Sequence, residues 1–255
     1  MYHYHQFKQP LESPDYNLVS KFVVSSIQDI IHEAIQTGKN RIIIDTNLTL
    51  GLPMENINKI AGPFVEAWAC QTFMQVEANA LNGYQLVNVE ACHRLNLADV
   101  VLQFKKSTSN ASIITGQVDV KATSQDIPNS GKSPNITSFA KIRTAYVVDP
   151  DMIFIILSLK HKVASQKDPM TLMMKGIMEI VDFNAYDLKH LASTDISYNP
   201  ALGTGQLQVK DIHYVTCQTR STWEFCQLIY QKCIASKGYD VWLKYAKNYG
   251  WIKDD

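Results

Sequence analysis

Residues 95–124 read LNLADVVLQFKKSTSNASIITGQVDVKATS. Its alternating pattern predicts two strands joined by a polar loop. Side chains alternate between the faces of a strand, so Asp119 and Lys121 point to one side. Val118 and Val120 point to the other side, and this apolar side can pack on a helix. The polar side then carries an acid and an amine next to each other.

A second carboxylate, Asp99, stands at the head of the first strand. If the two strands pair as a hairpin, Asp99 reaches the same place as Asp119 and Lys121. Hard divalent cations such as Mg²⁺ take oxygen ligands, and a lysine can orient water or stabilise charge on a phosphate. The pattern suits Mg²⁺-assisted hydrolysis of a phosphodiester. The alternative is a surface hairpin with a cross-strand ion pair, which contributes little stability.

The chain contains a second acid-x-Lys triplet, Asp187-Leu188-Lys189. Tyr186, Leu188 and Leu191 have helical spacing around it, so we interpret this triplet as the solvated face of a helix. Only the first triplet combines a strand, an upstream acid and a polar connection. The predicted site therefore rests on the first triplet.

Length and composition place the chain among single α/β domains. It has 255 residues, 46% of them hydrophobic, with 24 basic and 24 acidic side chains. We expect one domain over residues 1–255. No apolar run is long enough for a transmembrane helix, and the N-terminus lacks the zones of a signal peptide. We therefore expect no membrane partner. The five cysteines are odd in number and form no C-x-x-C pair, which favours a reduced cytoplasm without structural zinc.

The charge distribution is less neutral than its sum. A net charge of zero argues against a protein that coats nucleic acid by charge alone. Basic side chains outnumber acidic ones between residues 105 and 162. This local excess fits a cleft that must release its ligand, and it equally fits a solvated face.

The hydrophobic pattern predicts the order of elements. Helices are expected over residues 18–36, 62–76 and 135–147, with two more in 222–248 broken at Gly238. Strands are expected over residues 41–50, 84–90, 98–104, 113–122, 152–160, 176–183 and 206–215. Three consecutive strands over residues 84–122 predict a meander. The four methionines of residues 170–179 are expected to fill gaps in the core.

Within the helix over 62–76, Phe64, Val65, Trp68, Ala69, Phe73 and Val76 form the expected buried stripe. Glu66 is the polar residue of interest there. It is either an exposed first-turn glutamate, favoured by the helix dipole, or a carboxylate that leans toward the proposed metal site. Several other chemistries are excluded, because no H-E-x-x-H, G-x-S-x-G or dinucleotide-binding pattern is present. A phosphate-binding loop at Gly131-Lys132-Ser133 also fails, since Asp126 stands where its first glycine is required.

The order helix, three strands, helix and strand, with Asp99 and Asp119-x-Lys121 on the second and third strands, resembles the PD-(D/E)xK nuclease core. The segments LADVVLQF and GQVDVKATSQDIPNSGKSPNITSFAKIRTAYV resemble the blunt-cutting HincII and EcoRV branch of type II restriction endonucleases. Four further segments resemble HpaI-like enzymes in particular. They are GLPMENINKIAGPFVEAW, STDISYNPALGTGQ, VKDIHYVT and NYGWIK. Ala98 stands where many members of the superfamily carry proline, a change also found in the HincII branch. The resemblance implies a mixed α+β fold, with a central mixed sheet flanked by helices.

The resemblance also implies roles for individual residues. Asp99, Asp119 and the carbonyl of Val120 would bind Mg²⁺. Lys121 would position the attacking water, and Glu66 is a further catalytic candidate. The implied DNA-binding residues lie in the strand end and two loops that follow it: Thr123, Gln125, Asn129, Ser130, Lys132, Ser133, Asn135, Asn199 and Thr204.

The implied activity is hydrolysis of double-stranded DNA by a homodimer at a short palindrome. The expected site is GTTAAC, cut to blunt ends with 5′-phosphates, and a cognate DNA methyltransferase would belong to the same system. The catalytic core is expected over residues 62–160, with a DNA-reading and C-terminal helical part over 161–255. One alternative is a repair or recombination nuclease on the same core. The other is a DNA-binding protein with an inactive site, against which the intact Asp99, Asp119 and Lys121 argue.

Overall fold

The computed structural model describes residues 6–51, 54–79, 82–93, 96–105 and 112–253. Contacts between Cα atoms divide the chain into two compact units. The sheet unit comprises Phe22–Gly131 and Ile155–Ala185, and the helical unit comprises Met1–Lys21, Lys132–Phe154 and Tyr186–Asp255. This grouping does not test the single domain or its division at residue 160, which stay predictions.

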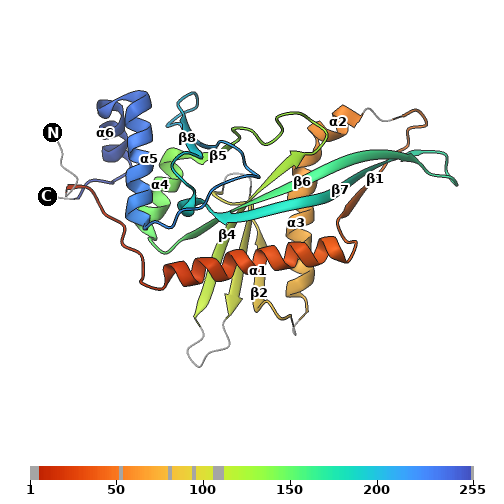
Figure 1. Ribbon diagram of the computed structural model, residues 1–255, viewed down its shortest axis with the longest axis horizontal. Coiled ribbons are helices and arrows are strands. Elements are labelled where there is room, and N and C mark those ends of the chain that lie inside the picture. The colour runs from red at the N-terminus through yellow and green to blue at the C-terminus, as the bar shows by residue number, and fades with distance from the viewer. Residues whose placement is uncertain (1–5, 52–53, 80–81, 94–95, 106–111, 254–255) are drawn as a thin grey trace. The chain divides into compact units, whose positions relative to one another are not determined.

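The elements confirm a mixed α+β fold with a sheet flanked by helices (Figure 1). The helices are α1 Tyr16–Gln36, α2 Met54–Lys59, α3 Ala61–Glu77, α4 Phe139–Val148, α5 Thr222–Lys237 and α6 Tyr239–Asn248, with a short 3₁₀ helix η2 at Leu188–His190. The strands are β1 Arg41–Asp45, β2 Leu86–Ala91, β3 Val100–Lys105, β4 Ile113–Ser124, β5 Asn135–Ser138, β6 Ile153–Lys167, β7 Met174–Asp187, β8 Ile196–Asn199 and β9 Gln206–Val209. They form a six-stranded sheet of order β1-β7-β6-β4-β3-β2 and a three-stranded sheet of order β5-β9-β8.

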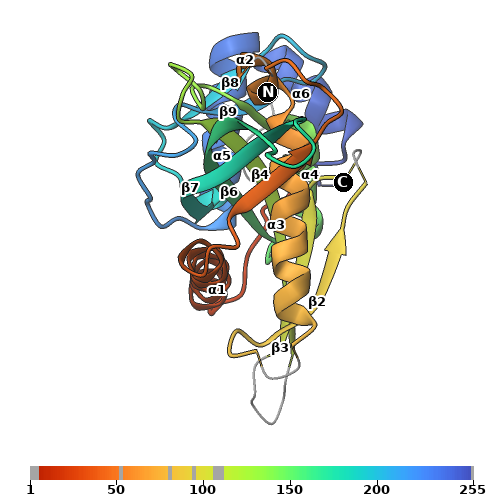
Figure 2. The same cartoon turned by 90° about the vertical axis from the view of Figure 1, so that its right-hand side faces the viewer.

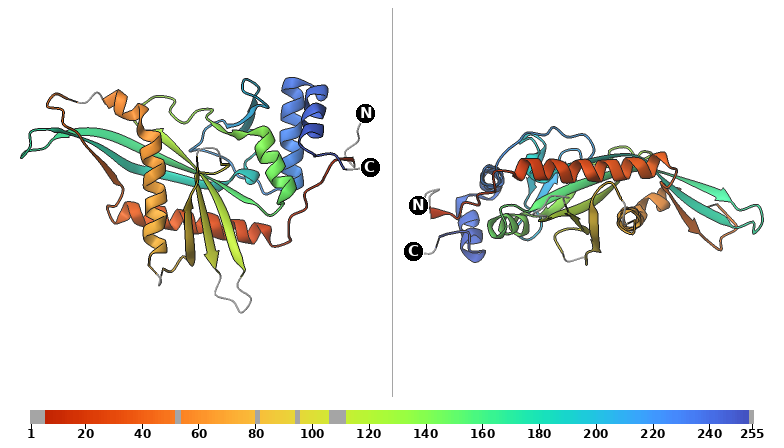
Figure 3. Two further views of the ribbon diagram at one scale, coloured as in Figure 1. Left: turned by 180° about the vertical axis from the view of Figure 1, so that it is seen from behind. Right: turned by 90° about the horizontal axis from the view of Figure 1, so that it is seen from below.

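The predicted meander is confirmed. Strands β2, β3 and β4 are antiparallel neighbours, and Val100 lies opposite Val118 (Figure 3). On β3 the alternate residues Val100, Leu102 and Phe104 are buried, so one face of the meander is apolar. The other face is left for the polar side chains of β4.

Helix α1 packs on the apolar face, as its stripe predicts. The ring of Phe22 meets the ring of Phe104 edge-on, with centroids 5.6 Å apart. The approach is close enough to require glycine at position 116, because a Cβ there would lie 2.8 Å from Val23. Because α1 covers this face of the meander, the side chains of Asp119 and Lys121 lie on the opposite face.

Helix α3 contacts β2 and β4 (Figure 2). Its buried residues include Val65, Trp68, Ala69 and Phe73, as predicted. Phe64 is 37% exposed, so its place in the buried stripe was predicted wrongly. The short helix α2 precedes α3 and was not predicted.

In the helical unit, the break between α5 and α6 at Gly238 is confirmed, with φ at +83°. The helix expected from residue 135 begins only at Phe139. Residues Asn135–Ser138 instead form β5, which pairs with β9, because tertiary pairing overrides a weak local helical preference. Across the described residues, no helix has the length and apolarity needed to cross a membrane.

The interpretation of Asp187-Leu188-Lys189 as a solvated helix was wrong. Strand β7 continues to Asp187 and ends in η2, and Asp187 and Lys189 are 2% and 0% exposed. The methionine prediction holds only in part: Met178 is buried, whereas Met170 is 92% exposed. Both errors arise where β6 and β7 extend beyond the lengths that the sequence pattern suggested.

Candidate active site

The sheet unit brings Asp99 and the first triplet together. Asp99 lies just before β3, and its N–H donates to the carbonyl of Val118 on β4 at 2.9 Å. Its carboxylate Oδ2 accepts a hydrogen bond from the Val120 N–H at 2.8 Å. The backbone of β4 therefore holds the Asp99 carboxylate beside the triplet, as the hairpin predicts.

Lys121 and Asp119 form an ion pair, with Nζ 2.6 Å from Oδ2. The same amine lies 3.4 Å from the Val120 carbonyl oxygen. The side chain of Lys121 is 23% exposed and that of Asp119 is 7% exposed. The amine thus bridges a buried carboxylate and the surface, where it can meet a substrate.

The electrostatics of the site depend on burial. Burial raises the pKa of the Asp119 carboxyl to about 7, and the Lys121 amine opposes this shift. Asp99 and Glu66 raise the Asp119 pKa further, because like charges disfavour ionisation. The Asp119 carboxylate is therefore short of compensating positive charge.

Glu66 lies on α3 and is half-buried. Burial raises the pKa of its carboxyl, the Asp99 charge raises it further, and Lys121 lowers it. The side chain therefore senses both Asp99 and Lys121. The second interpretation of Glu66, in which it leans toward the site, stays a prediction.

Within the described ranges, no three or more His, Cys, Asp and Glu side chains form a ready-made metal cluster. The donor chemistry nevertheless fits Mg²⁺. Asp99, Asp119 and the Val120 carbonyl offer the oxygen ligands that hard cations prefer. A buried carboxylate with a raised pKa also gains most from an added positive charge.

The loop after β4 is anchored in the sheet unit as far as residue 131. The Gln125 N–H donates to the His161 carbonyl at 2.7 Å, and the Ser130 hydroxyl accepts from the Ser124 N–H at 2.7 Å. Gln125 and Asn129 are exposed, and Asn129 has a left-handed φ of 61°. Thr123 is only 2% exposed, so its side chain has no surface to offer to DNA.

The remaining predicted DNA contacts lie in the helical unit. Asn135 and Asn199 come together: the Asn199 Nδ2 donates to the Asn135 Oδ1 at 3.5 Å. Lys132 is exposed and pairs with Asp211 at 2.5 Å. The Thr204 hydroxyl is engaged within the fold, because it lies 3.2 Å from the Ser138 hydroxyl and accepts from the Ala140 N–H at 3.4 Å.

Sequence reasoning missed Gln208 and Asp211, which hold the residues beside Asn135. The Gln208 Nε2 donates to the Ser133 carbonyl at 2.9 Å. The signal was present, since an amide and a carboxylate in the segment QLQVKD follow a glycine-bearing loop. Without the pairing of β5 and β9, however, nothing in the sequence connects them to residues 132–135.

Comparison with known proteins shows the family to which the chain belongs. The family model of type II restriction endonuclease HpaI matches residues 3–250. The type II restriction enzyme HpaI of Haemophilus parainfluenzae is 55% identical over 250 residues, which cover 97% of each chain. A solved structure, the NlaIV restriction endonuclease, aligns over 89% of this chain and 91% of its own at 12% identity. Its TM-score of 0.43 is too low to establish a shared fold.

The protein is a type II restriction endonuclease, an enzyme that cleaves DNA at specific sites. Within that class the chain belongs to the HpaI family. The resemblance that the sequence motifs indicated is thereby confirmed over almost the whole chain.

Proposed function

We propose that this enzyme is a Mg²⁺-dependent homodimer that cuts GTTAAC in its middle and leaves blunt ends with 5′-phosphates. The observation that carries the chemistry is the Asp99 carboxylate held at 2.8 Å by the Val120 N–H, beside the Asp119–Lys121 pair. The family membership supports the class of reaction, and the resemblance of the loops supports the site. The enzyme would act in the cytoplasm, in one system with a cognate DNA methyltransferase.

In the proposed mechanism, Asp99, Asp119 and the Val120 carbonyl hold the metal ion. When bound, Mg²⁺ would supply a Lewis acid that stabilises charge on the scissile phosphate. Lys121 orients the water that attacks phosphorus in line with the departing 3′-oxygen. Its pairing with Asp119 fixes the amine, so the water meets a donor that is already oriented.

A dimer follows from the palindrome, because a two-fold assembly matches two-fold DNA. The sheet unit offers a surface for it. The turn between β6 and β7 exposes Met170 by 92% and Leu172 by 57%. The segment after β1 exposes Leu50 by 81%, and it is tied to this turn by the Met174 N–H, which donates to the Leu48 carbonyl at 2.8 Å. Grouped apolar side chains of this kind mark contact surfaces.

DNA reading is proposed for the exposed amide of Asn135 and the half-buried amide of Asn199. Asn135 and Asn199 can pair bidentately with adenine, and each such pair contributes about 1–3 kcal/mol of discrimination. Asn129, Ser130, Ser133 and Gln125 would contact the same duplex. Lys132 would approach phosphate or the minor groove. The burial of Thr123 and the internal bonds of Thr204 remove these two from the proposed contacts.

One digestion tests the proposal. A long DNA of known sequence is incubated with the protein and Mg²⁺, and both ends of every fragment are sequenced. Flush ends within GTTAAC with 5′-phosphates are expected, and chelation of the metal should stop cleavage. A four-base overhang would place the protein in another branch, and cuts at branched or damaged DNA would favour the repair nuclease. Sedimentation of the protein, alone and on a GTTAAC duplex, tests the dimer.

A further inference from the structure

The two amides proposed to read bases flank one strand. β9 is the middle strand of the three-stranded sheet, and Gln208 lies opposite Asn135 of β5 and opposite Ser197 of β8. Gln206 lies opposite Asn199. A contact that holds β5 and the residues just before it against β9 therefore also sets the distance between Asn135 and Asn199.

The residue pair before Asn135 needs such fixing. Ser133 has a φ of 48°, in the left-handed region that costs a residue with a side chain about 1 kcal/mol or more. Its N–H donates to the Lys210 carbonyl at 3.1 Å, and its carbonyl accepts from the Gln208 Nε2 at 2.9 Å. Both polar groups of this strained peptide are thus held by β9 or the residue that follows it.

A side chain is needed because the regular ladder stops short of Ser133. The pairing of β5 with β9 shifts register between Asn135 and Thr137, and β5 begins at Asn135. The Ser133 carbonyl therefore lies outside the strand ladder, and the Gln208 carboxamide replaces the missing backbone donor. Lys132, one residue earlier, forms an isolated antiparallel β-bridge with Asp211 and also an ion pair with its carboxylate, and neither contact reaches the Ser133 carbonyl.

We propose that Gln208 is a positioning residue for DNA reading. Its carboxamide holds the Ser133 carbonyl in the left-handed turn, and this turn sets the place at which Asn135 presents its own amide beside Asn199. This inference rests on the proposed function, because it assigns a reason for the geometry of the proposed readers. Gln208 acts through Ser133, and contact of its side chain with a base is not part of the role.

The first test compares Gln208→Ala with Gln208→Glu, which keeps the shape but replaces the amide donor by a carboxylate that repels the carbonyl. Cleavage of GTTAAC and of single-mismatch sites is measured with Mg²⁺. Loss of one hydrogen bond should reduce the preference for GTTAAC by about fivefold to tenfold in the alanine variant. The glutamate variant should lose at least as much. Non-specific binding at low salt should change little in the alanine variant, since no phosphate contact is removed.

A double-mutant cycle separates positioning from direct reading. Glycine adopts the left-handed region without a steric cost, so Ser133→Gly removes the strain that Gln208 opposes. In that background, Gln208→Ala should reduce the preference for GTTAAC by less than about twofold. An equal loss in both backgrounds would mean that Gln208 acts without Ser133, and the proposal would be overturned.

Amide hydrogen exchange in the DNA-free protein tests the clamp without any cleavage assay. Gln208→Ala should speed exchange at Ser133. Gln206→Ala is the matched control, because Gln206 lies on the same face of β9 and its carboxamide forms no hydrogen bond within the part of the chain described. If exchange at Ser133 is unchanged in Gln208→Ala, Gln208 does not hold the turn at Ser133. The proposed positioning role is then overturned, whereas the proposed function is unaffected. Wild-type protein that cuts no specific site overturns the proposed function, and with it the reading role, even if the exchange data show the clamp.

Discussion

The two acid-x-Lys triplets of this chain are both largely buried, yet their charges are satisfied differently. In the sheet unit, Asp119 is 5% exposed and pairs with Lys121, whose side chain is 23% exposed. In the helical unit, the Asp187 carboxylate accepts from the Tyr16 hydroxyl and the Ser20 hydroxyl, each at 2.7 Å. It also accepts from the Lys189 N–H at 2.9 Å.

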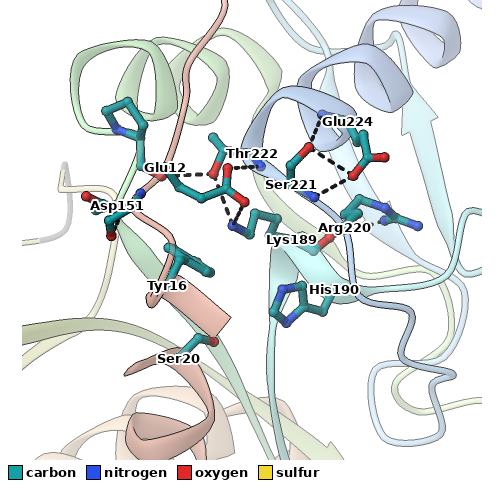
Figure 4. Close-up of polar contacts among 12 residues, drawn as sticks. Glu12, Tyr16, Ser20, Asp151, Lys189, His190, Arg220, Ser221, Thr222 and Glu224 are labelled. Atoms are coloured by element: carbon teal, nitrogen blue, oxygen red, sulfur yellow. Dashed lines mark hydrogen bonds and ion pairs between the residues drawn. The ribbon is translucent and has the colours of Figure 1, made fainter. Parts of the chain in front are cut away.

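Lys189 is enclosed where Lys121 is open. Its amine lies 3.1 Å from the Thr222 hydroxyl, 3.5 Å from the Glu12 carboxylate and 3.0 Å from the centre of the Tyr16 ring (Figure 4). The other oxygen of Glu12 accepts from the Thr222 N–H at 2.6 Å, at the start of α5. Burial lowers the pKa of Lys189, and the Asp187 and Glu12 charges counteract part of that effect.

The difference separates the proposed active site from a structural cluster. Asp187 and Lys189 have partners on all sides, so a substrate or ion would gain little by joining them. Asp119 keeps a raised pKa of about 7 because burial outweighs its partner, and a cation would relieve it. Identical residue types at identical spacing thus lie in different environments, and the number of fixed partners distinguishes the proposed site from the structural cluster.

The largest expected effect is on catalysis by the first triplet. Asp119→Asn removes a proposed metal ligand, and Lys121→Ala removes the group proposed to orient water. Each should reduce single-turnover cleavage by at least about 10²- to 10³-fold. Specific binding to the duplex should persist in Asp119→Asn, because a carboxylate facing phosphate repels it. The fold should persist too, since a buried charge is lost without leaving an opposite one deeply enclosed.

Cleavage by either variant within severalfold of the wild-type rate would place the active site elsewhere. Thermal melting of the same preparations is the control, because it shows that lost cleavage is not lost folding. An active Asp119→Asn variant would also remove the contrast between the two triplets.

The second largest effect is on stability. Lys189→Ala leaves the Glu12 carboxylate enclosed without its cation, so the free energy of unfolding should fall by about 3–5 kcal/mol. Urea denaturation measures this loss. The combined replacement Glu12→Gln with Lys189→Met removes both charges and should recover much of it. Cleavage per folded molecule should stay near wild type, and a collapse of cleavage in a fully folded variant would contradict a structural role.

The sequence predicted the first site because its information is local. Alternation along β4 places Asp119 and Lys121 on one face, and Asp99 immediately precedes the neighbouring strand β3, where the Val120 N–H holds its carboxylate. The meander in turn follows from three consecutive strands with short connections. The α1 and α3 stripes were readable for the same reason, although the stripe of α3 wrongly included Phe64.

The second triplet could not be interpreted from its neighbours in sequence. Its partners Glu12, Tyr16 and Ser20 come from the N-terminal segment of the helical unit, and its partner Thr222 lies 33 residues after Lys189. Asp187 and Lys189 are buried only when these distant residues pack against them in the folded chain. The residues around Asn135, proposed to read DNA, present the same difficulty, because β5 forms only through its pairing with β9, more than sixty residues away by the Asn135–Gln208 register.

Replacing Glu66 should reduce cleavage less than replacing Asp119 or Lys121. If it supports Asp99 and Lys121 from α3, Glu66→Gln should lower cleavage by about 10- to 100-fold, a size typical of residues that support metal ligands. Cleavage measured over a range of Mg²⁺ concentrations separates weaker metal binding from slower chemistry. Unchanged cleavage at every concentration would return Glu66 to the first interpretation, a first-turn glutamate on a helix.

The smallest expected effect tests whether Asp187 is saturated by its partners. Ser20 is 1% exposed and donates its hydroxyl to Asp187, so Ser20→Ala removes one of two hydroxyl donors to the same carboxylate oxygen. The free energy of unfolding should fall by about 1 kcal/mol, slightly offset by the better helix propensity of alanine in α1. Ser25→Ala is the matched control, since Ser25 is exposed on the same helix and should gain a few tenths of a kcal/mol (roughly the propensity difference). If the two variants unfold at the same urea concentration, the hydroxyl contributes nothing to Asp187. The second triplet would then be no better satisfied than the first, and partner number would no longer explain why only one of them is a site.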